Sequence, residues 1–389
     1  MKCGIRELPD KLSCTGCFAC AVVCSVRAIK DDSDEWGFHY PHIDNELCVR
    51  CGACTRVCPV LNKGSSDGTL GCYAAQHEDA EVVTKSASGG VFPAIAENVL
   101  ARHGVVYGCE MSLSDCKARH TRVTSLLDLA RLQGSKYVQS NLNGVFKEVI
   151  VDLSRGLDVL FSGTPCQCAG LRKCVPAQYQ QHLLLVEVVC HGVMSPLLFE
   201  AYKQELSSRV NSPIKEVLFR DKLSCPGRSS FVVRFEDPTK DICVRSYTDP
   251  YGRLFQSRLT LRNSCYHCPA RGKNSCADLT IGDYWGVEKC HPELAGRGAI
   301  SVVMVRTHKG EVSFFDARLS RWKTDYSLAI KDNPSICKDT CKNEAQYGLF
   351  VRCFRKMSFV NAVTRTLDGP WPIRLMRRIV RKVGSLLRA

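Results

Sequence analysis

The sequence predicts two consecutive folded parts: a short α+β module, followed by a larger α/β domain. Two runs of cysteines with the same spacing lie within the first sixty residues. Small polar residues at 62–70 then indicate a linker. Beyond it, short apolar runs alternate with segments of helical periodicity, which is typical of a sheet with many parallel strands. The expected boundaries are 1–64, 65–345 (about 70–155 and 156–345) and a C-terminal tail at 346–389.

The first module carries a repeated C-x2-C-x2-C-x3-C pattern, and the second copy ends in Cys58-Pro59. This spacing is typical of bacterial two-cluster ferredoxins, in which each run gives three thiolates to one [4Fe-4S] cluster and its fourth to the other. Two zinc sites are the alternative, but these usually pair C-x2-C knuckles across a longer loop. The predicted ligand sets are Cys14, Cys17, Cys20 and Cys58 for one cluster, and Cys48, Cys51, Cys54 and Cys24 for the other.

The larger part reads as alternating strands and helices. Strands are predicted at 71–75, 105–108, 158–163 and 183–190, and helices at 91–103, 125–132, 143–156 and 195–206. Further strands at 231–236 and 298–306 have no partner that the pattern identifies. The alternation predicts a sheet with a substantial parallel part.

Three loops of this domain carry residues suited to chemistry. In SASGGVF, residues 86–92, a turn of small residues leads directly into a helix, so free backbone N–H groups could meet a phosphate. Two further loops follow predicted strands and present Cys166 and Cys190 at the carboxyl ends, where open α/β sheets bind ligands.

These two thiols could join the C-x2-C pair Cys265 and Cys268 as the ligands of a third [4Fe-4S] cluster. Cys276, eight residues past Cys268, could substitute for one of them. Buried apolar thiols and a zinc site are the alternatives that spacing leaves open, because the set comes from three distant segments.

The C-terminal stretch 371–389 has six basic residues and no acidic one, and its apolar residues recur at helical spacing. This pattern fits an interfacial helix on anionic lipid, which would make the protein peripheral to the inner face of a membrane. A docked partner or a basic surface helix fits equally well.

The composition is that of a globular protein in a reducing compartment. The chain has 25 cysteines, but it is much longer than a disulfide scaffold and has no apolar signal segment at its start, so we expect a cytoplasmic protein. Its longest apolar runs, 183–189 and 299–305, are too short to span a membrane. The net charge of +14 could suit nucleic acid, but acidic electron carriers and phosphate-bearing cofactors also require a basic surface, and we predict no nucleic-acid partner.

After the two cysteine runs, the chain carries a characteristic order of motifs: EWGFHYPHID, SGGVF, GSKYVQS, LFSGTPCQCAGL, VCHGVMSP and CYHCPARGKNSCADLTIGDYWG. This order resembles the beta subunits of coenzyme F420-reducing hydrogenases and dehydrogenases, preceded here by a ferredoxin module. Reductases of chlorophyll pigments in plants and bacteria are also similar. The resemblance covers residue 14 to about residue 310.

The resemblance implies an iron-sulfur flavoprotein whose α/β domain binds FAD beside a [4Fe-4S] cluster. The ligands of that cluster would fall on Cys166, Cys190, Cys265 and Cys268. The residues implied at the flavin are Ser88, Gly89 and Gly90, with Ser135 and Lys136 near it.

We therefore predict an oxidoreductase that passes electrons from a redox partner protein or reduced ferredoxin through [4Fe-4S] clusters to FAD, and on to an organic acceptor or coenzyme F420. His191 could relay protons, because imidazole titrates near neutrality, or could be a turn residue or a donor to the cluster. Asp283 could accept a hydroxyl or end a turn. The alternatives are a non-catalytic ferredoxin-type electron-transfer subunit that docks a partner enzyme, and a zinc-bound interaction protein. Assembly into a homo-oligomer is also compatible with the sequence.

Overall fold

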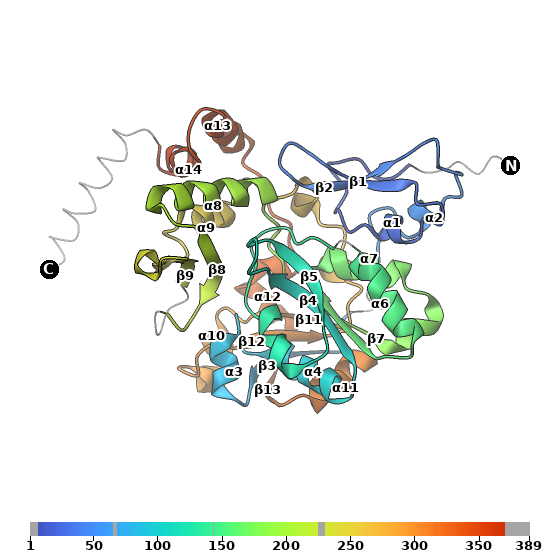
Figure 1. The fold of residues 1–389 in the computed structure, drawn as a ribbon. Helices are drawn as coiled ribbons and strands as arrows, with labels where there is room; N and C mark the ends of the chain where they lie inside the picture. The colour runs from blue at the N-terminus through green and yellow to red at the C-terminus, as the bar shows by residue number, and fades with distance from the viewer. Residues whose placement is uncertain (1–6, 65–67, 143, 225–229, 370–389) are drawn as a thin grey trace.

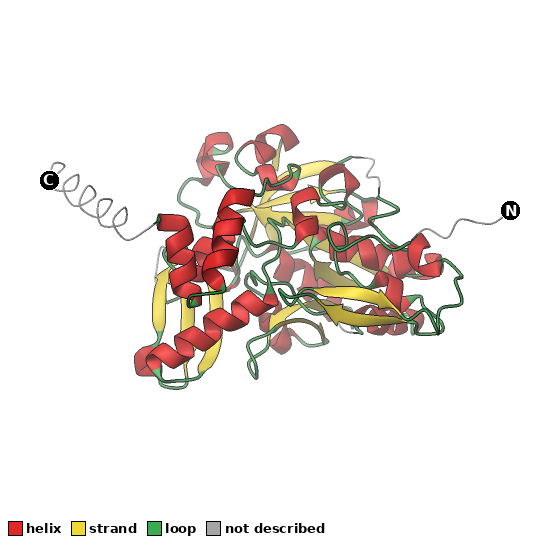
Figure 2. Ribbon diagram, turned by 90° about the horizontal axis from the view of Figure 1, so that it is seen from above, coloured by secondary structure: helices red, strands yellow, loops and turns green. Residues whose placement is uncertain are grey.

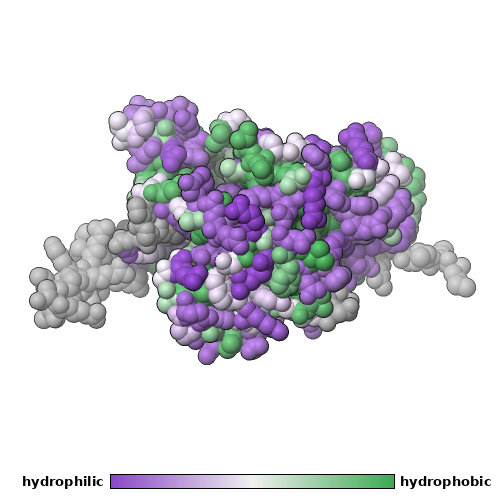
Figure 3. Space-filling model, turned by 90° about the horizontal axis from the view of Figure 1, so that it is seen from below, coloured by the Kyte–Doolittle hydropathy of each residue, from purple (hydrophilic) through white to green (hydrophobic). Residues whose placement is uncertain are grey.

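The computed structural model describes residues 7–64, 68–142, 144–224 and 230–369. These residues form three sheets, of two, three and eight strands (Figure 1). Seen from above, the three-stranded sheet with its helices lies beside the central sheet, and the N-terminal module lies on the other side (Figure 2). None of the helices in these four ranges is long and apolar enough to cross a membrane. The face in Figure 3 is largely hydrophilic, with separate hydrophobic areas.

The N-terminal module is a hairpin between two short helices. Its elements are α1 (Ala19–Val22), β1 (Ile29–Ser33), β2 (His39–Ile43) and α2 (Ala53–Arg56). Strands β1 and β2 pair antiparallel. Each helix begins after a residue in the left-handed region, Phe18 at φ 57° and Gly52 at φ 72°, so each cysteine run turns sharply just after its second thiol.

The central sheet has the order β13-β3-β12-β11-β7-β6-β4-β5. Its strands are β3 (Gly71–His77), β4 (Val105–Met111), β5 (Ala118–Val123), β6 (Val159–Gly163), β7 (Leu183–Val188), β11 (Leu279–Asp283), β12 (Ser301–Val305) and β13 (Leu319–Thr324). Only β4, β6, β7 and β11 are mutually parallel. The other pairings are antiparallel, so the expected parallel sheet is confined to the middle four strands.

Helices cover both faces of this sheet. They are α3 (Ala80–Lys85), α4 (Val91–Ala101), α5 (Leu126–Leu129), α6 (Val145–Ser154), α7 (Pro165–Cys174), α10 (Val287–Cys290), α11 (His308–Asp316) and α12 (Tyr326–Lys331). Helices α4 and α11 share one core with the sheet, whereas α6 and α7 share another with residues of α1. Short 3₁₀ turns are η1 (Ala130–Leu132), η2 (Ala177–His182), η3 (Pro238–Lys240), η4 (Asn263–His267), η5 (Gly272–Asn274), η6 (Pro292–Leu294) and η7 (Pro334–Ile336).

A second layer contains the small sheet β10-β9-β8 and four helices. Its elements are α8 (Pro196–Val210), β8 (Ile214–Asp221), β9 (Ser230–Phe235), β10 (Ile242–Arg245), α9 (Pro250–Ser257), α13 (Glu344–Phe354) and α14 (Phe359–Asp368). They share one aromatic core, which includes Tyr202, Phe219, Phe231 and Tyr251.

The segment predicted as a tail from residue 346 is folded as far as α14. Phe350, Cys353 and Phe359 are buried in the core of the second layer, which ties α13 and α14 to α8 and α9. The basic stretch 371–389, to which the interfacial-helix prediction applies, lies outside the described residues.

Candidate functional site

A cavity of about 1000 Å³ lies between the central sheet and the small sheet. The carboxyl ends of β6, β7 and β11 form its floor, through residues 162–164, 188–193 and 281–283. Arg220 from β8 and Phe255 from α9 line the opposite wall. The cavity therefore lies where open α/β sheets bind their ligands.

The predicted phosphate loop borders this cavity, with Ser88 and Gly90 in its lining. The Gly89 N–H donates to Ser301 Oγ at 2.9 Å, and that hydroxyl donates to Ser88 Oγ at 3.0 Å. A Cβ at Gly89 would lie 2.6 Å from the Ala75 carbonyl oxygen. Gly89 is therefore needed for close packing on β3, and its N–H is already used.

The backbone N–H groups available to a phosphate are those at the start of α4. Gly90, at φ 82°, is the N-cap of this helix, and no side chain caps it. An uncapped helix N-terminus that borders a cavity favours an anion there.

Ser135 and Lys136 also line the cavity, but the ammonium of Lys136 has a structural role. Its Nζ donates to the carbonyl oxygens of residues 131–134 at 2.6 to 3.4 Å. Burial lowers its pKa. Lys136 thus closes the turn after η1 and holds the loop that carries Tyr137 and Ser135.

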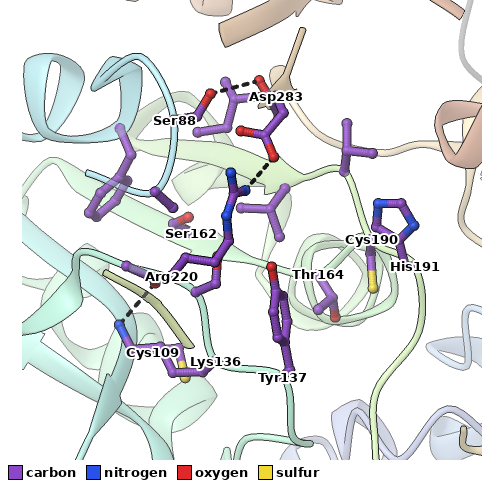
Figure 4. Close-up of a pocket in the computed structure, with 18 of the residues that line it drawn as sticks. Ser88, Cys109, Lys136, Tyr137, Ser162, Thr164, Cys190, His191, Arg220 and Asp283 are labelled. Carbon is purple, nitrogen blue, oxygen red and sulfur yellow. Dashed lines mark hydrogen bonds and ion pairs between the residues drawn. The ribbon is translucent and has the colours of Figure 1, made fainter. Parts of the chain in front are cut away.

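Two basic residues of β8 and its following turn connect the small sheet to the central sheet. Arg220 pairs with Asp283, the last residue of β11, and Figure 4 shows the two side chains directed at one another above Tyr137. Lys222 Nζ donates to the carbonyl oxygens of Val83 at 3.0 Å and Ser88 at 3.1 Å. Burial, aided by Arg220, lowers the pKa of Lys222 to about 8. The carboxylate of Asp283, considered earlier as a hydroxyl acceptor or turn residue, is therefore already paired with an arginine.

His191 lines the cavity beside Cys190 (Figure 4). Its Nδ1 lies 2.9 Å from Ser335 Oγ and its ring is 5.6 Å from that of Trp285. Burial, followed by the charges of Arg258 and Arg271, lowers its pKa to about 4. The imidazole is therefore neutral at physiological pH, and the premise that it titrates near neutrality does not hold here.

The structure brings together the four thiols predicted to form a third set. Cys166 lies in the first turn of α7, Cys190 follows β7, Cys265 lies in η4 and Cys268 follows it. Each of them interacts electrostatically with at least one other member. Cys276 does not join them: its electrostatic neighbours are Lys173, Arg172 and Glu187.

Two sulfurs of this third set have hydrogen-bonding neighbours, whereas burial disfavours the free thiolates. Cys190 Sγ accepts the Gly192 N–H at 3.4 Å, and Cys166 Sγ lies 3.2 Å from Thr164 Oγ1. Burial raises the pKa of Cys166, Cys190 and Cys268 to about 11, so these thiols ionise when a bound metal replaces the proton.

The first N-terminal set is also assembled. Cys14, Cys17, Cys20 and Cys58 interact electrostatically and line one small cavity. In the second set, Cys54 interacts with Cys48 and Cys51, and Cys24 Sγ accepts the Ala28 N–H at 3.2 Å. In the described part of the chain, no three His, Cys, Asp or Glu side chains are close enough to share a single metal ion.

Two arginines at these sites were not identified from the sequence. Arg220 lies 63 residues from its partner Asp283, so no local pattern links them. Arg262 is buried between the first N-terminal set and the third set, and electrostatic interactions join it to Cys14 and Cys166. Its position three residues before Cys265 is the one signal that could have drawn attention to it.

Two regions of the chain match families of known proteins. Residues 157–322 match the family described as the C terminus of the coenzyme F420 hydrogenase/dehydrogenase beta subunit, and residues 13–62 match the 4Fe-4S dicluster domain. One of the subunits of the F(420)H(2) dehydrogenase from Methanosarcina mazei is 21% identical over 340 residues, which covers 80% of this chain and 84% of that protein.

A chain of the xenon-derivatised F420-reducing [NiFe] hydrogenase complex from Methanosarcina barkeri is 16% identical. The match has a TM-score of 0.48 and covers 76% of this chain and 96% of that one. The resemblance predicted from the motifs is confirmed, and the N-terminal module is similar to a 4Fe-4S dicluster domain.

Proposed function

We propose that the chain is an iron-sulfur flavoprotein subunit that accepts electrons from a protein donor at its N-terminal module and passes them to FAD bound in the large cavity. An organic molecule or a deazaflavin such as coenzyme F420 would be the final acceptor. Bound clusters would carry single electrons, and a bound flavin would collect two of them for release as a hydride.

The observation that carries this proposal is the order of the three thiol sets. Cys51 of the second set is exposed, whereas the first set is buried. Cys17 of the first set interacts with Cys166 of the third, and Cys190 of the third set lines the cavity. The sets thus form a series from the surface of the dicluster module to the cavity, as a path for electrons requires.

The cavity has features that suit a flavin and an acceptor. Its volume exceeds that of many small-molecule sites, and the uncapped N-terminus of α4 could receive a pyrophosphate. Tyr137 and Phe255 stack with ring centroids 4.2 Å apart in its wall, which offers an aromatic surface. Arg245 and Arg258 add positive charge, and none of the ion pairs among the described residues joins either to a carboxylate, so an acceptor with acidic groups is favoured.

A non-catalytic electron-transfer subunit is the second candidate, because the relative from Methanosarcina mazei is described as one subunit of a dehydrogenase. Such a subunit would hold the clusters and dock a partner enzyme without a flavin of its own. Both candidates require a protein partner.

The decisive experiment measures iron, acid-labile sulfide and flavin in anaerobically prepared full-length protein, before and after addition of FAD. We expect about twelve irons per chain, from three clusters of four, and one FAD. Cys166→Ser should lose about four irons, whereas the matched control Cys276→Ser should lose none. Full iron with no FAD or FMN bound would favour the non-catalytic subunit. Equal iron in both variants would remove the third cluster from the proposal.

A further inference from the structure

Arg262 is the largest of the fully buried side chains, with 1% of its surface exposed. Its Nε donates to the Cys14 carbonyl oxygen, one terminal nitrogen to Gln139 Oε1 and the other to the His39 carbonyl oxygen, each at 2.9 Å. The guanidinium also lies 4.0 Å from the centre of the Tyr40 ring. Each of its three nitrogens thus donates a hydrogen bond, but to a neutral group.

The charge of this side chain has no carboxylate partner among the ion pairs that the described residues form. A guanidinium keeps its proton inside a protein, and an uncompensated buried charge is strongly unfavourable. Carbonyl oxygens and aromatic rings offset part of this cost only. The structure therefore requires further negative charge near Arg262.

The thiols around Arg262 could supply that charge. Burial raises the pKa of Cys14 and of Cys166, and the Arg262 charge opposes this rise at both. Cys14 belongs to the first N-terminal set and Cys166 to the third set. Arg262 connects the two parts, because its backbone N–H donates to the Val193 carbonyl oxygen and its own carbonyl oxygen accepts the Cys265 N–H, while its side chain reaches the N-terminal module.

We propose that Arg262 is a positive charge shared by the first and third cluster sites, which compensates the net negative charge of both clusters and raises both reduction potentials. This inference rests on the proposed function. Electrons move one at a time between these two sites, and a cation that stabilises the reduced form at both keeps their potentials close to one another. Arg262 acts through the clusters and is a positioning and tuning residue rather than a catalytic one.

Arg271 provides an internal comparison. It is buried too, and it donates to the Cys190 carbonyl oxygen at 3.2 Å. Its charge counteracts the rise that burial causes in the pKa of Cys190 and Cys268, two members of the third set. Arg271 should therefore affect the third cluster alone, and less strongly, because Asp339 lies 3.6 Å from it.

The test is an anaerobic redox titration of full-length protein, followed by electron paramagnetic resonance, in the wild type, Arg262→Gln, Arg262→Lys and Arg271→Gln. In Arg262→Gln we expect the potentials of two clusters to become more negative while that of the second N-terminal cluster stays unchanged. Arg262→Lys keeps the charge but loses the three-way hydrogen bonding, so its potentials should stay near those of the wild type. Arg271→Gln should shift one cluster.

Unchanged potentials in Arg262→Gln with full iron, or equal shifts of all three clusters, would overturn the proposal. If Arg262→Gln does not fold, Arg262→Met, an uncharged side chain of similar length, decides: more negative potentials of two clusters support a role of the charge, and wild-type potentials with full iron contradict it. A wild-type protein without a third cluster would contradict the proposed function instead, and the first cluster alone would then report on Arg262.

Discussion

Replacement of Gly170 by alanine tests whether α7 and the dicluster module are in direct contact. A Cβ at this position would lie 2.9 Å from Cys17 Sγ and 3.0 Å from Cys17 Cβ. Cys17 cannot easily move away, because it is buried in the core that α1 shares with α6 and α7. Gly348 in α13 is a matched control, since a Cβ there would meet only the end of the Arg352 side chain at 3.5 Å.

Two effects of opposite sign decide the outcome. Glycine to alanine in a helix interior stabilises a protein by about 1 kcal/mol, and this gain applies to both positions. Forcing a methyl group into a closely packed contact costs about 1–3 kcal/mol, and this cost applies to Gly170 alone. Gly348→Ala should therefore be about 1 kcal/mol more stable than the wild type, and Gly170→Ala about 1–3 kcal/mol less stable than Gly348→Ala.

The assay is anaerobic thermal unfolding at one fixed scan rate, with the visible absorbance of the clusters followed in parallel in the presence of an iron chelator. A fixed rate matters because unfolding with loss of clusters is irreversible. Gly170→Ala should unfold at a lower temperature and release iron sooner than Gly348→Ala. Equal stability and equal iron retention in the two variants would show that α7 does not pack on Cys17.

Two further predictions concern the walls of the cavity. Burial lowers the pKa of His120 to about 4, whereas the imidazole of an unfolded chain titrates near 6.5. The unfolded state therefore takes up a proton first, and the protein loses stability as the pH falls between these values. His120 should account for about 1.4 kcal/mol of the stability lost between pH 7.5 and 5.5. Chemical denaturation at both pH values should show a smaller loss in His120→Gln, and an equal loss in variant and wild type would contradict the assignment. Ser301→Ala leaves the buried Gly89 N–H without its acceptor, which should lower the free energy of unfolding by about 1–3 kcal/mol. The variant should also bind FAD more weakly, as measured by flavin fluorescence. An unchanged free energy of unfolding together with unchanged FAD binding would refute the role of this hydroxyl.

Local patterns predicted the parts of the structure that depend on local interactions. The cysteine spacing predicted the similarity of the N-terminal module to a dicluster domain, because three of the four cysteines in each predicted set lie within seven residues. The alternation of apolar and polar residues predicted β3, β4, β6 and β7, as well as α4, α6 and α8, to within a few residues at most ends. Cys166 and Cys190 do follow strands that end at one edge of the sheet, as the order of elements indicated.

The same patterns did not predict which neighbouring strands are parallel and which are antiparallel. Every residue of β12 is buried, so its burial pattern is the same for a parallel and an antiparallel neighbour. Strand β8 was missed although it alternates, because one of its buried positions is Asp221, whose carboxylate accepts the Ser224 N–H at 2.6 Å. A buried acid interrupts the apolar pattern by which a strand is recognised.

The pKa of His191 and the roles of the arginines could not be predicted from the sequence for a different reason. Burial lowers the pKa of His191, and the charges of Arg258 and Arg271, which approach it from separate segments of the chain, add to this effect. In the sequence, Arg262 and Arg220 resemble ordinary surface arginines, but the fold buries Arg262 and half-buries Arg220. Such interactions depend on which segments meet in space, and no spacing within one segment encodes them.

Helix α7 has a consequence for the distance between the first and third thiol sets, which we propose to be neighbouring cluster sites. Cys166, of the third set, and Gly170, which touches Cys17 of the first, are separated by one turn of the same helix, a rise of roughly 6 Å. The gap between the sites is thus fixed by the pitch of a single rigid element and does not depend on a flexible joint between modules. Inserting one residue in this turn would rotate the contact by about 100° and part the two sites, even though every cysteine were kept.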